Sequence, residues 1–392
     1  MVGSDPKPTI AGILRDNIAA YHEKYKMDSH LLKVVDDITR CHTLACGRHL
    51  TVCTCCGTVE FSYNSCRNRH CPDCQNAQKH KWMQQRKKEL LPVSYFHLVF
   101  TVPHQLNALF MSNKAICYKL LFDSVWATID HFAQMPKWLG AKAGCTALLH
   151  TWGQNLSYHP HIHCIMPSGG LTEDGSEWLS THPRYFAPVR ELSEWFKKHL
   201  IKSISAAKGQ LEQTTGEREF SDLLAGLQKI NWVVFAQPSF TKPDYVIDYL
   251  GNYTHKIAIS NHRLIKVEDG NVFFGWKDYK DGGSQKVMHL PVLEFIRRYL
   301  EHILPPNFYK IRHFGIFANR FKAQNIEDAR ECLRLQDKEM ELVDGDDTGV
   351  EITLPHGCPY MGACRHCGGA KVSLYHLQIS EFKDTELPLL AG

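Results

Sequence analysis

Two histidines at alternate positions are the residues whose spacing first suggests metal chemistry. His161 and His163 flank Ile162 in the segment YHPHIHCI, residues 158–165. Because side chains alternate along a strand, both imidazoles would project from one face, where they can ligate a divalent ion. Gln154 is a candidate oxygen ligand if the chain returns in a hairpin. An isolated His-x-His pair is more often structural, so the interpretation requires a partner.

Two tyrosines supply that partner. Tyr249 and Tyr253 lie within DYLGNYTHKIAISNHR, residues 248–263, and on a helix their Cβ atoms would be about 5–6 Å apart on one face. A phenol oxygen can attack a phosphodiester when a metal ion polarises the phosphate, and two phenols permit two sequential transfers. The alternative is a pair of rings packed in a core. Gly251 and Asn252 weaken that alternative, because both are poor helix formers.

The fifteen cysteines indicate metal sites rather than disulfides, because the N-terminus lacks an apolar signal core. Two CxxC pairs predict one structural four-thiolate Zn²⁺ site formed by Cys53, Cys56, Cys71 and Cys74. A second candidate site consists of Cys41, His49, Cys66 and His70, and a third of His356, Cys358, Cys364 and Cys367. Bound zinc would replace the core that such short segments cannot build.

Charge is informative through its distribution, since 45 Lys and Arg against 41 Asp and Glu give a net charge of only +4. Basic residues are dense between positions 67 and 88, which suits contact with a phosphate backbone. The alternative is a solvated helix face. The candidate DNA-binding residues are Arg67, Arg69, Lys79, Lys81, Arg86, Lys87 and Lys88, together with Lys256 of the tyrosine segment.

The elements that must position these residues predict an α+β fold. Hydrophobic residues at 44% and charged residues at 22% are ordinary globular values, which exclude fibrous and low-complexity proteins. Apolar runs are too short to span a membrane, so we expect a cytoplasmic protein. Strands are predicted at residues 95–102, 145–152, 158–166 and 232–237. Helices are predicted in the first forty residues, at 75–90 and 114–132, twice within 190–229, at 245–253 and over most of 291–335, with a hairpin at 257–276.

Taken together, the motifs resemble the insertion sequence 91 family of rolling-circle transposases, which are two-tyrosine HUH endonucleases. The resemblance covers about residues 35–335. It is carried by CRNRHCPDCQ (66–75), FHLVFTVPHQLN (96–107), HTWGQNLSYHPHIHCI (150–165), DYLGNYTHKIAISNHR (248–263), WKDY (276–279), EFIRRYLEHILP (294–305) and IRHFGIFAN (311–319). The last cysteine cluster departs from the simpler CPxCG pattern, because an insertion separates Cys358 from Cys364.

The resemblance implies a palm-like antiparallel sheet that carries His161 and His163, with the tyrosine helix against it. It implies that Mg²⁺ or Mn²⁺ assists cleavage of single-stranded DNA, which leaves a 5′-phosphotyrosine on Tyr249 or Tyr253 and a free 3′-OH. We therefore expect a bacterial, nucleoid-associated DNA transposase. Its expected partners are single-stranded DNA, the hairpin at the transposon end, target DNA, and the host helicase and replication machinery, because the chain has no GxxxxGK[ST] loop.

This interpretation divides the chain into five parts. They are an N-terminal helical and zinc-binding DNA-binding domain (1–90), a nuclease domain (91–275) with a helical insertion at about 190–229, a basic helical region (276–335), an acidic linker (336–351) and a C-terminal zinc knuckle with its tail (352–392). Two other functions fit parts of the pattern. A plasmid or phage replication initiator uses the same nicking chemistry, and a non-enzymatic zinc-finger DNA-binding protein explains the cysteines alone.

Overall fold

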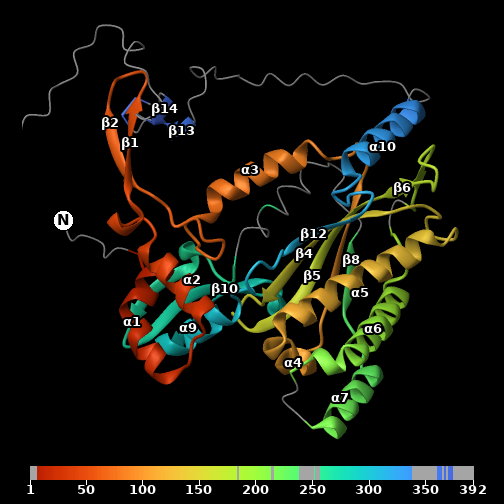
Figure 1. Ribbon diagram of the computed structural model, residues 1–392, viewed down its shortest axis with the longest axis horizontal. Coiled ribbons are helices and arrows are strands. Elements are labelled where there is room, and N and C mark those ends of the chain that lie inside the picture. Colours follow the sequence, from red (N-terminus) through yellow and green to blue (C-terminus); the bar gives the residue numbers. More distant parts are fainter. Residues whose placement is uncertain are drawn as a thin grey trace, which may run out of the picture.

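The computed structural model describes residues 7–182, 185–212, 216–237, 251, 257–337, 360–363, 366–367 and 370–373. Figure 1 shows a central sheet with its helices at one end of the molecule and a helical module at the other. Helices and strands are mixed, so the predicted α+β class is confirmed. In the part of the chain that the structure describes, no helix is both long and apolar enough to cross a membrane.

The central sheet has five antiparallel strands in the order β12-β4-β5-β3-β8. The strands are β3 (Tyr95–Thr101), β4 (Gly144–Trp152), β5 (Tyr158–Pro167), β8 (Val234–Gln237) and β12 (Ile311–Gly315). Four of them confirm predicted strands. The prediction is wrong at β12, which interrupts a region expected to be mostly helical. Pairing with β4 supplies the strand's backbone partners, and Arg312 lies 4.4 Å from the Phe122 ring centroid.

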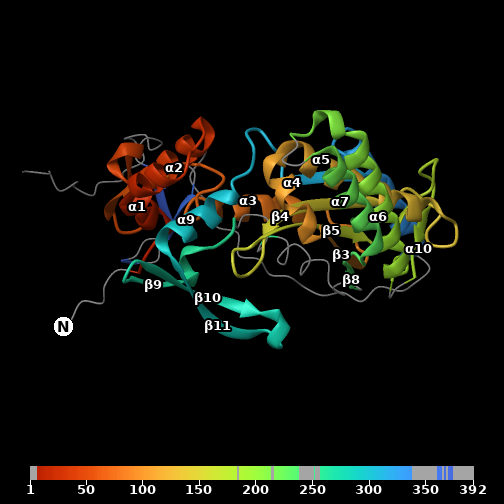
Figure 2. The ribbon, with the colours of Figure 1, turned by 90° about the horizontal axis from the view of Figure 1, so that it is seen from below.

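Strand pairing gives the two faces of this sheet different chemistry. Residues directly opposite one another on paired strands share a face, so Phe100, Leu149 and Ile162 lie together, and all three are fully buried. This apolar face is covered by α4 (Asn107–Ser112), α5 (Lys114–Gln134), α6 (Val189–Ala206) and α7 (Glu217–Lys229). Figure 2 shows these helices on a single side of the sheet. His161 and His163 consequently lie on the opposite face.

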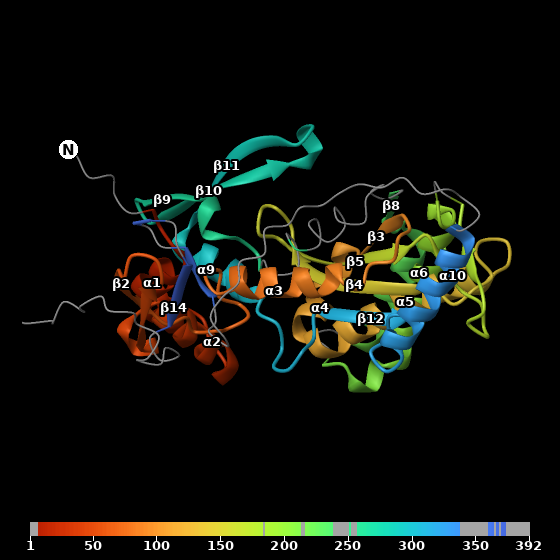
Figure 3. The same ribbon diagram turned by 90° about the horizontal axis from the view of Figure 1, so that it is seen from above.

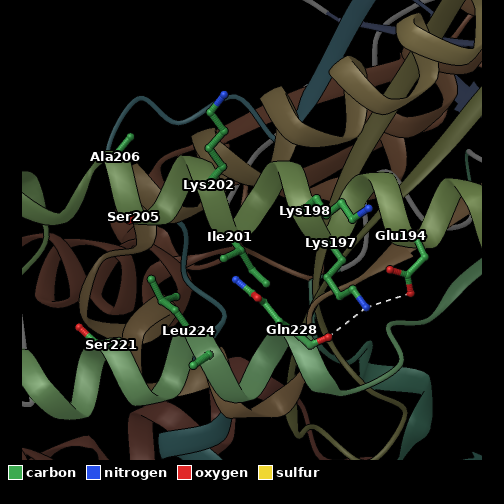
Figure 4. Close-up of a pocket in the computed structure, with 11 residues that line it drawn as sticks. Glu194, Lys197, Lys198, Ile201, Lys202, Ser205, Ala206, Ser221, Leu224 and Gln228 are labelled. Carbon is green, nitrogen blue, oxygen red and sulfur yellow. Dashed lines mark hydrogen bonds and ion pairs between the residues drawn. The ribbon is translucent and has the colours of Figure 1, made fainter.

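An open pocket of about 810 Å³ lies between α6 and α7 (Figure 4). Lys197 on its wall donates to the Glu194 carboxylate at 2.9 Å and to the Gln228 backbone carbonyl at 3.3 Å. These bonds join the two helices of the predicted insertion. Because the pocket opens on the helical side of the sheet, it is separate from the histidines.

The helical module combines the N-terminus with residues far along the chain. It contains α1 (Ile10–Lys24), α2 (Ser29–Arg40), α9 (Val292–Glu301), β9 (Leu264–Glu268), β10 (Asn271–Asp278) and β11 (Ser284–Pro291). Thr9 and Asp28 cap α1 and α2 by accepting hydrogen bonds from backbone N–H groups in the first turn. The region predicted as a separate C-terminal unit therefore divides, with α9 in this module and β12 in the central sheet. Figure 3 shows the β10–β11 hairpin projecting from it.

The remaining elements connect these parts. They are β1 (Arg48–Cys53), β2 (Val59–Tyr63), α3 (Gln75–Lys87), β6 (Gly169–Leu171), β7 (Trp178–Ser180), α10 (Lys322–Asp337), β13 (Tyr360–Ala363) and β14 (Ala370–Ser373). Strands β13, β14, β1 and β2 form one sheet in that order. The helix predicted at 75–90 is confirmed as α3, which lies between the module and the central sheet (Figures 1 and 3).

Candidate active site and zinc clusters

Three histidines gather on the exposed-chemistry face of the central sheet, opposite α4–α7. His150 on β4 pairs directly with His161 on β5, and His163 follows on the same face. One ring nitrogen from each of the three lies within 4.8 Å of the others. The sequence analysis missed His150. A hairpin whose turn is centred on Asn155 and Leu156 pairs positions 150 and 161, so the turn residues were the signal that could have found it.

Hydrogen bonds orient the imidazoles. The Nδ1 of His161 lies 2.7 Å from the His159 carbonyl, to which it donates as N–H, so its Nε2 keeps a lone pair. The Nδ1 of His163 lies 2.9 Å from the Nε2 of His97 on β3. Burial lowers the pKa of His161 to about 4 and holds that of His163 well below its usual range. Both rings are therefore neutral near pH 7, which is the form that ligates a metal ion.

Gln154 lies in the β4–β5 turn, beyond the Trp152–Tyr158 pair, and not beside the histidines as expected. Its backbone carbonyl accepts a hydrogen bond from Arg263 at 2.5 Å. Leu156 in the same turn is fully buried in the core of the helical module. The turn therefore docks the histidine hairpin onto the module, and the third nitrogen beside His161 and His163 comes from His150.

Tyr249, Tyr253 and Lys256 lie outside the described residues, but Gly251 between the tyrosines is described as helical. A Cβ at Gly251 would lie 2.3 Å from the Sδ of Met83 on α3, so no larger residue fits without a shift. Met83 in turn packs against Ile165, which shares the sheet face of His161 and His163. The tyrosine segment therefore approaches α3 on the histidine side of the sheet.

The basic residues around α3 serve two different purposes. Arg69 is half-buried and donates to the backbone carbonyls of Pro305, at 2.7 Å, and Phe308. Arg86 pairs with Glu89 at 2.7 Å, and only 11% of its side chain is exposed. These two guanidinium groups make internal contacts instead of facing solvent. Of the other candidates, Arg67, Lys87 and Lys88 are exposed, Lys79 is half-buried, and the side chain of Lys81 lies outside the described part.

Four thiols form a buried cluster where α2 ends and α3 begins: Cys41, Cys66, Cys71 and Cys74. Cys74 Sγ lies 3.4 Å from Cys41 Sγ and 3.5 Å from Cys66 Sγ. A tetrahedral zinc ion with Zn–S bonds of about 2.3 Å requires sulfur atoms about 3.8 Å apart, so the set fits structural zinc. Because Cys74 directly precedes α3, this cluster fixes the start of the helix that contacts Gly251.

This grouping corrects the predicted zinc ligands. Cys71 and Cys74 join thiols from the predicted second site and do not share a site with Cys53 and Cys56. Chain folding, not adjacency of the two CxxC pairs, decides which thiols meet.

The two histidines of the predicted second site lie elsewhere. His70 is buried, accepts a hydrogen bond from the Leu304 backbone N–H at 3.1 Å, and lies 3.1 Å from the Asn68 side-chain oxygen. Burial lowers its pKa to about 2, so it is a neutral structural residue. His49 on β1 lies 2.6 Å from the side-chain oxygen of Asn64.

A second thiol cluster brings together Cys53, Cys56 and Cys367. Sγ of Cys53 lies 3.5 Å from Sγ of Cys367, although 314 positions separate them in the sequence. The predicted third site placed Cys367 with His356, Cys358 and Cys364, and those three lie outside the described residues. The structure therefore joins thiols from the predicted first and third sites.

Comparison with known proteins supports both parts of this arrangement. A family model described as "Transposase zinc-binding domain" matches residues 13–102, and one described as "Putative transposase" matches residues 144–325. "Putative transposase y4qJ" of Sinorhizobium fredii is 43% identical over 335 residues, which cover 83% of this chain and 84% of that protein. The chain belongs to the IS91 family of transposases.

A more distant relative supports the same assignment. The "Transposase for insertion sequence element IS801" of Pseudomonas savastanoi pv. phaseolicola is 27% identical over 298 residues, covering 74% of this chain and 69% of the relative. No solved structure matches the chain. The IS91-family membership makes this protein a DNA-processing enzyme with a zinc-binding domain and DNA substrates, as the sequence resemblance predicted.

We expect His97→Ala in this transposase to weaken binding of the catalytic ion about 10–100-fold, the usual effect of removing the partner that orients a metal-binding histidine. If His163 binds through Nε2, its Nδ1–H must donate to the Nε2 of His97. The metal concentration for half-maximal DNA cleavage should rise, and excess metal should restore most of the rate. His97→Gln keeps an acceptor and should behave closer to wild type. A lower rate that excess metal does not restore would contradict the positioning role.

We expect Cys71→Ser to unfold the zinc-binding module of this IS91-family transposase, because a structural zinc contributes about 10 kcal/mol of folding free energy. Metal analysis should show about one zinc fewer per chain, and hydrogen exchange should show lost protection in α1, α2 and α3. Cys74→Ser should behave in the same way. Cys46→Ser is a matched control, because Cys46 lies outside the cluster. Wild-type protein that binds DNA fully without zinc would refute this role.

Proposed function

We propose that this transposase cleaves single-stranded DNA at the transposon ends through a phosphotyrosine intermediate and transfers the strand to a target. The observation that carries the proposal is the cluster of His150, His161 and His163 on the sheet face that Gly251 approaches through Met83. A palm-like antiparallel sheet with this arrangement matches what an HUH endonuclease requires. Neither a DNA-binding module nor a structural role needs three neutral imidazoles on one face.

In this proposal His150, His161 and His163 hold a divalent ion, which supplies electrostatic stabilisation of the phosphate being attacked. Each ring has a neighbour that fixes its orientation, so the set is preorganised before DNA binds. Of the two ions expected from the family resemblance, Mn²⁺ fits the three nitrogen donors better, because Mg²⁺ takes nearly all of its ligands as oxygen.

Tyr249 or Tyr253 supplies the nucleophile. The phenol oxygen forms a bond to phosphorus, the P–O3′ bond breaks, and the departing strand leaves as a free 3′-OH. In the transfer step a 3′-OH attacks the phosphotyrosine and releases the phenol. The ester conserves the energy of the broken phosphodiester, so strand transfer needs no ATP.

The exposed basic residues Arg67, Lys87 and Lys88 are the best placed of the predicted phosphate contacts, since they lie beside the first zinc cluster and at the end of α3. We assign them to binding of single-stranded DNA and the transposon-end hairpin. Arg69 and Arg86 are excluded from this role by their internal contacts. Unwinding of the donor and replacement of the transferred strand fall to a host helicase and the host replication machinery.

The direct test is incubation with end-labelled single-stranded DNA from the transposon end in Mn²⁺ or Mg²⁺. We expect a protein–DNA adduct that survives denaturation and a cleaved strand with a free 3′-OH. Binding without any adduct would instead support a non-enzymatic DNA-binding protein. Adduct formation on a plasmid origin, with none on transposon ends, would support a replication initiator.

A further inference from the structure

The C-terminal strands complete a sheet that begins near the N-terminus. Strand β14 pairs antiparallel with β1, with Thr51 opposite Ser373 and Cys53 opposite Lys371. This register places the β13–β14 turn, which carries Cys367, at the same end of the sheet as the β1–β2 turn, which carries Cys56. Two cysteine-bearing turns from opposite ends of the chain therefore lie side by side.

This small sheet has little hydrophobic core of its own. Strand β2 is mostly exposed, and on its face Phe61 is 60% and Val59 48% accessible to solvent. Short sheets are marginally stable in water unless something else holds them. In addition, joining β14 to β1 closes a chain loop of about three hundred residues, which carries an entropic cost. Backbone pairing at a few residues is a weak means of holding such a contact.

We propose that a zinc ion bound by Cys53, Cys56 and Cys367 clasps the C-terminal strands to the N-terminal zinc-binding domain. The three Sγ atoms lie within 4.8 Å of one another, and the Cys53 and Cys367 pair at 3.5 Å is near the separation that tetrahedral thiolates adopt. A disulfide would use only two of the three sulfurs and would require an S–S distance of about 2.05 Å. Three converging thiols are instead the donor set of a structural zinc site.

The clasp has a consequence for the whole molecule. Helix α10 ends at Asp337 at one end of the molecule, whereas β13 and β14 lie at the other end, beside β1 (Figures 1 and 3). The acidic stretch at residues 338–359 joins these two points. Zinc at the clasp therefore ties the N-terminal hairpin to the far end of the central sheet through a second covalent route. This inference rests on the zinc-binding domain and not on the proposed cleavage chemistry.

The first test counts zinc in the full-length protein. Wild type should contain two zinc ions per chain, Cys367→Ser one, and Cys71→Ser one through loss of the other cluster. Cys55→Ser is the matched control, because Cys55 is exposed, adjacent to Cys56 and outside the cluster, and it should keep two. Two zinc ions in Cys367→Ser, or only one in wild type, would overturn the proposal. Formation of the DNA adduct is measured separately, so failure of the cleavage proposal leaves this count unaffected.

A second test does not depend on whether Cys367→Ser folds. A specific protease site is inserted between residues 338 and 351 of the otherwise wild-type chain, which is then cut under native conditions. The C-terminal fragment should co-elute with the remainder on size exclusion and should be released when a chelator removes zinc. Fragments that separate while zinc is still bound would overturn the clasp. So would a fragment that resists the chelator but is released by a thiol reductant, since that result indicates a disulfide.

Discussion

Replacement of His161 with alanine is expected to lower the rate of single-strand DNA cleavage about 10³-fold or more. His161 shares one sheet face with His150 and His163, and its Nε2 keeps a free lone pair because Nδ1 donates to the His159 carbonyl. Loss of a catalytic metal ion removes several kcal/mol of charge stabilisation, and about 1.4 kcal/mol corresponds to a tenfold change in rate. Affinity for single-stranded DNA should change little, because phosphate contacts elsewhere supply it.

Cleavage of labelled DNA and equilibrium binding, measured on the same preparations, check this result. His150→Ala should cause a loss comparable to that of His161→Ala, whereas Gln154→Ala should have a small effect, since Gln154 contributes a backbone carbonyl to the turn. His22→Ala is the control, because His22 is exposed in the last turn of α1. Comparable cleavage by His161→Ala and wild type would show that the three histidines are structural.

The double substitution Tyr249→Phe with Tyr253→Phe is expected to remove the covalent DNA adduct completely. Phenylalanine keeps the ring and its packing but lacks the attacking oxygen, so the change separates chemistry from stability. Each single substitution should stop complete transposition, because two transfers require two phenols. Each should nevertheless retain some adduct, since phenols one helical turn apart can approach the same phosphate with modest readjustment.

Adduct formation on denaturing gels and transposition frequency in cells measure the two effects independently. Tyr279→Phe is the matched control, because Tyr279 is 64% exposed next to β10, away from the histidine face. Normal transposition by one single variant and no adduct from the other would identify an enzyme with one nucleophilic tyrosine. The second phenol would then be a packing residue.

Local sequence patterns predicted those elements whose stability arises from their own residues. Alternating apolar side chains located β3, β4 and β5, and the helical period located α5 and α6. The five-residue strand β12 was missed, because its partner β4 lies more than 150 positions away and its own sequence has little strand signal. The same limitation placed α9 in the wrong neighbourhood, since its packing against α1 is also long-range.

The sequence by itself determined the family, the chemistry and most of the reacting groups of this IS91-family transposase. Residue type and spacing suffice for a His-x-His strand and for CxxC pairs, because neighbours in the chain are necessarily neighbours in space. The tertiary structure decided which distant groups meet. It added His150 to His161 through strand register, and it separated Cys53 from Cys71 by pairing one with Cys367 and the other with Cys41. Ligand sets of this kind form only when remote segments fold together, and spacing along the chain carries no record of that distance.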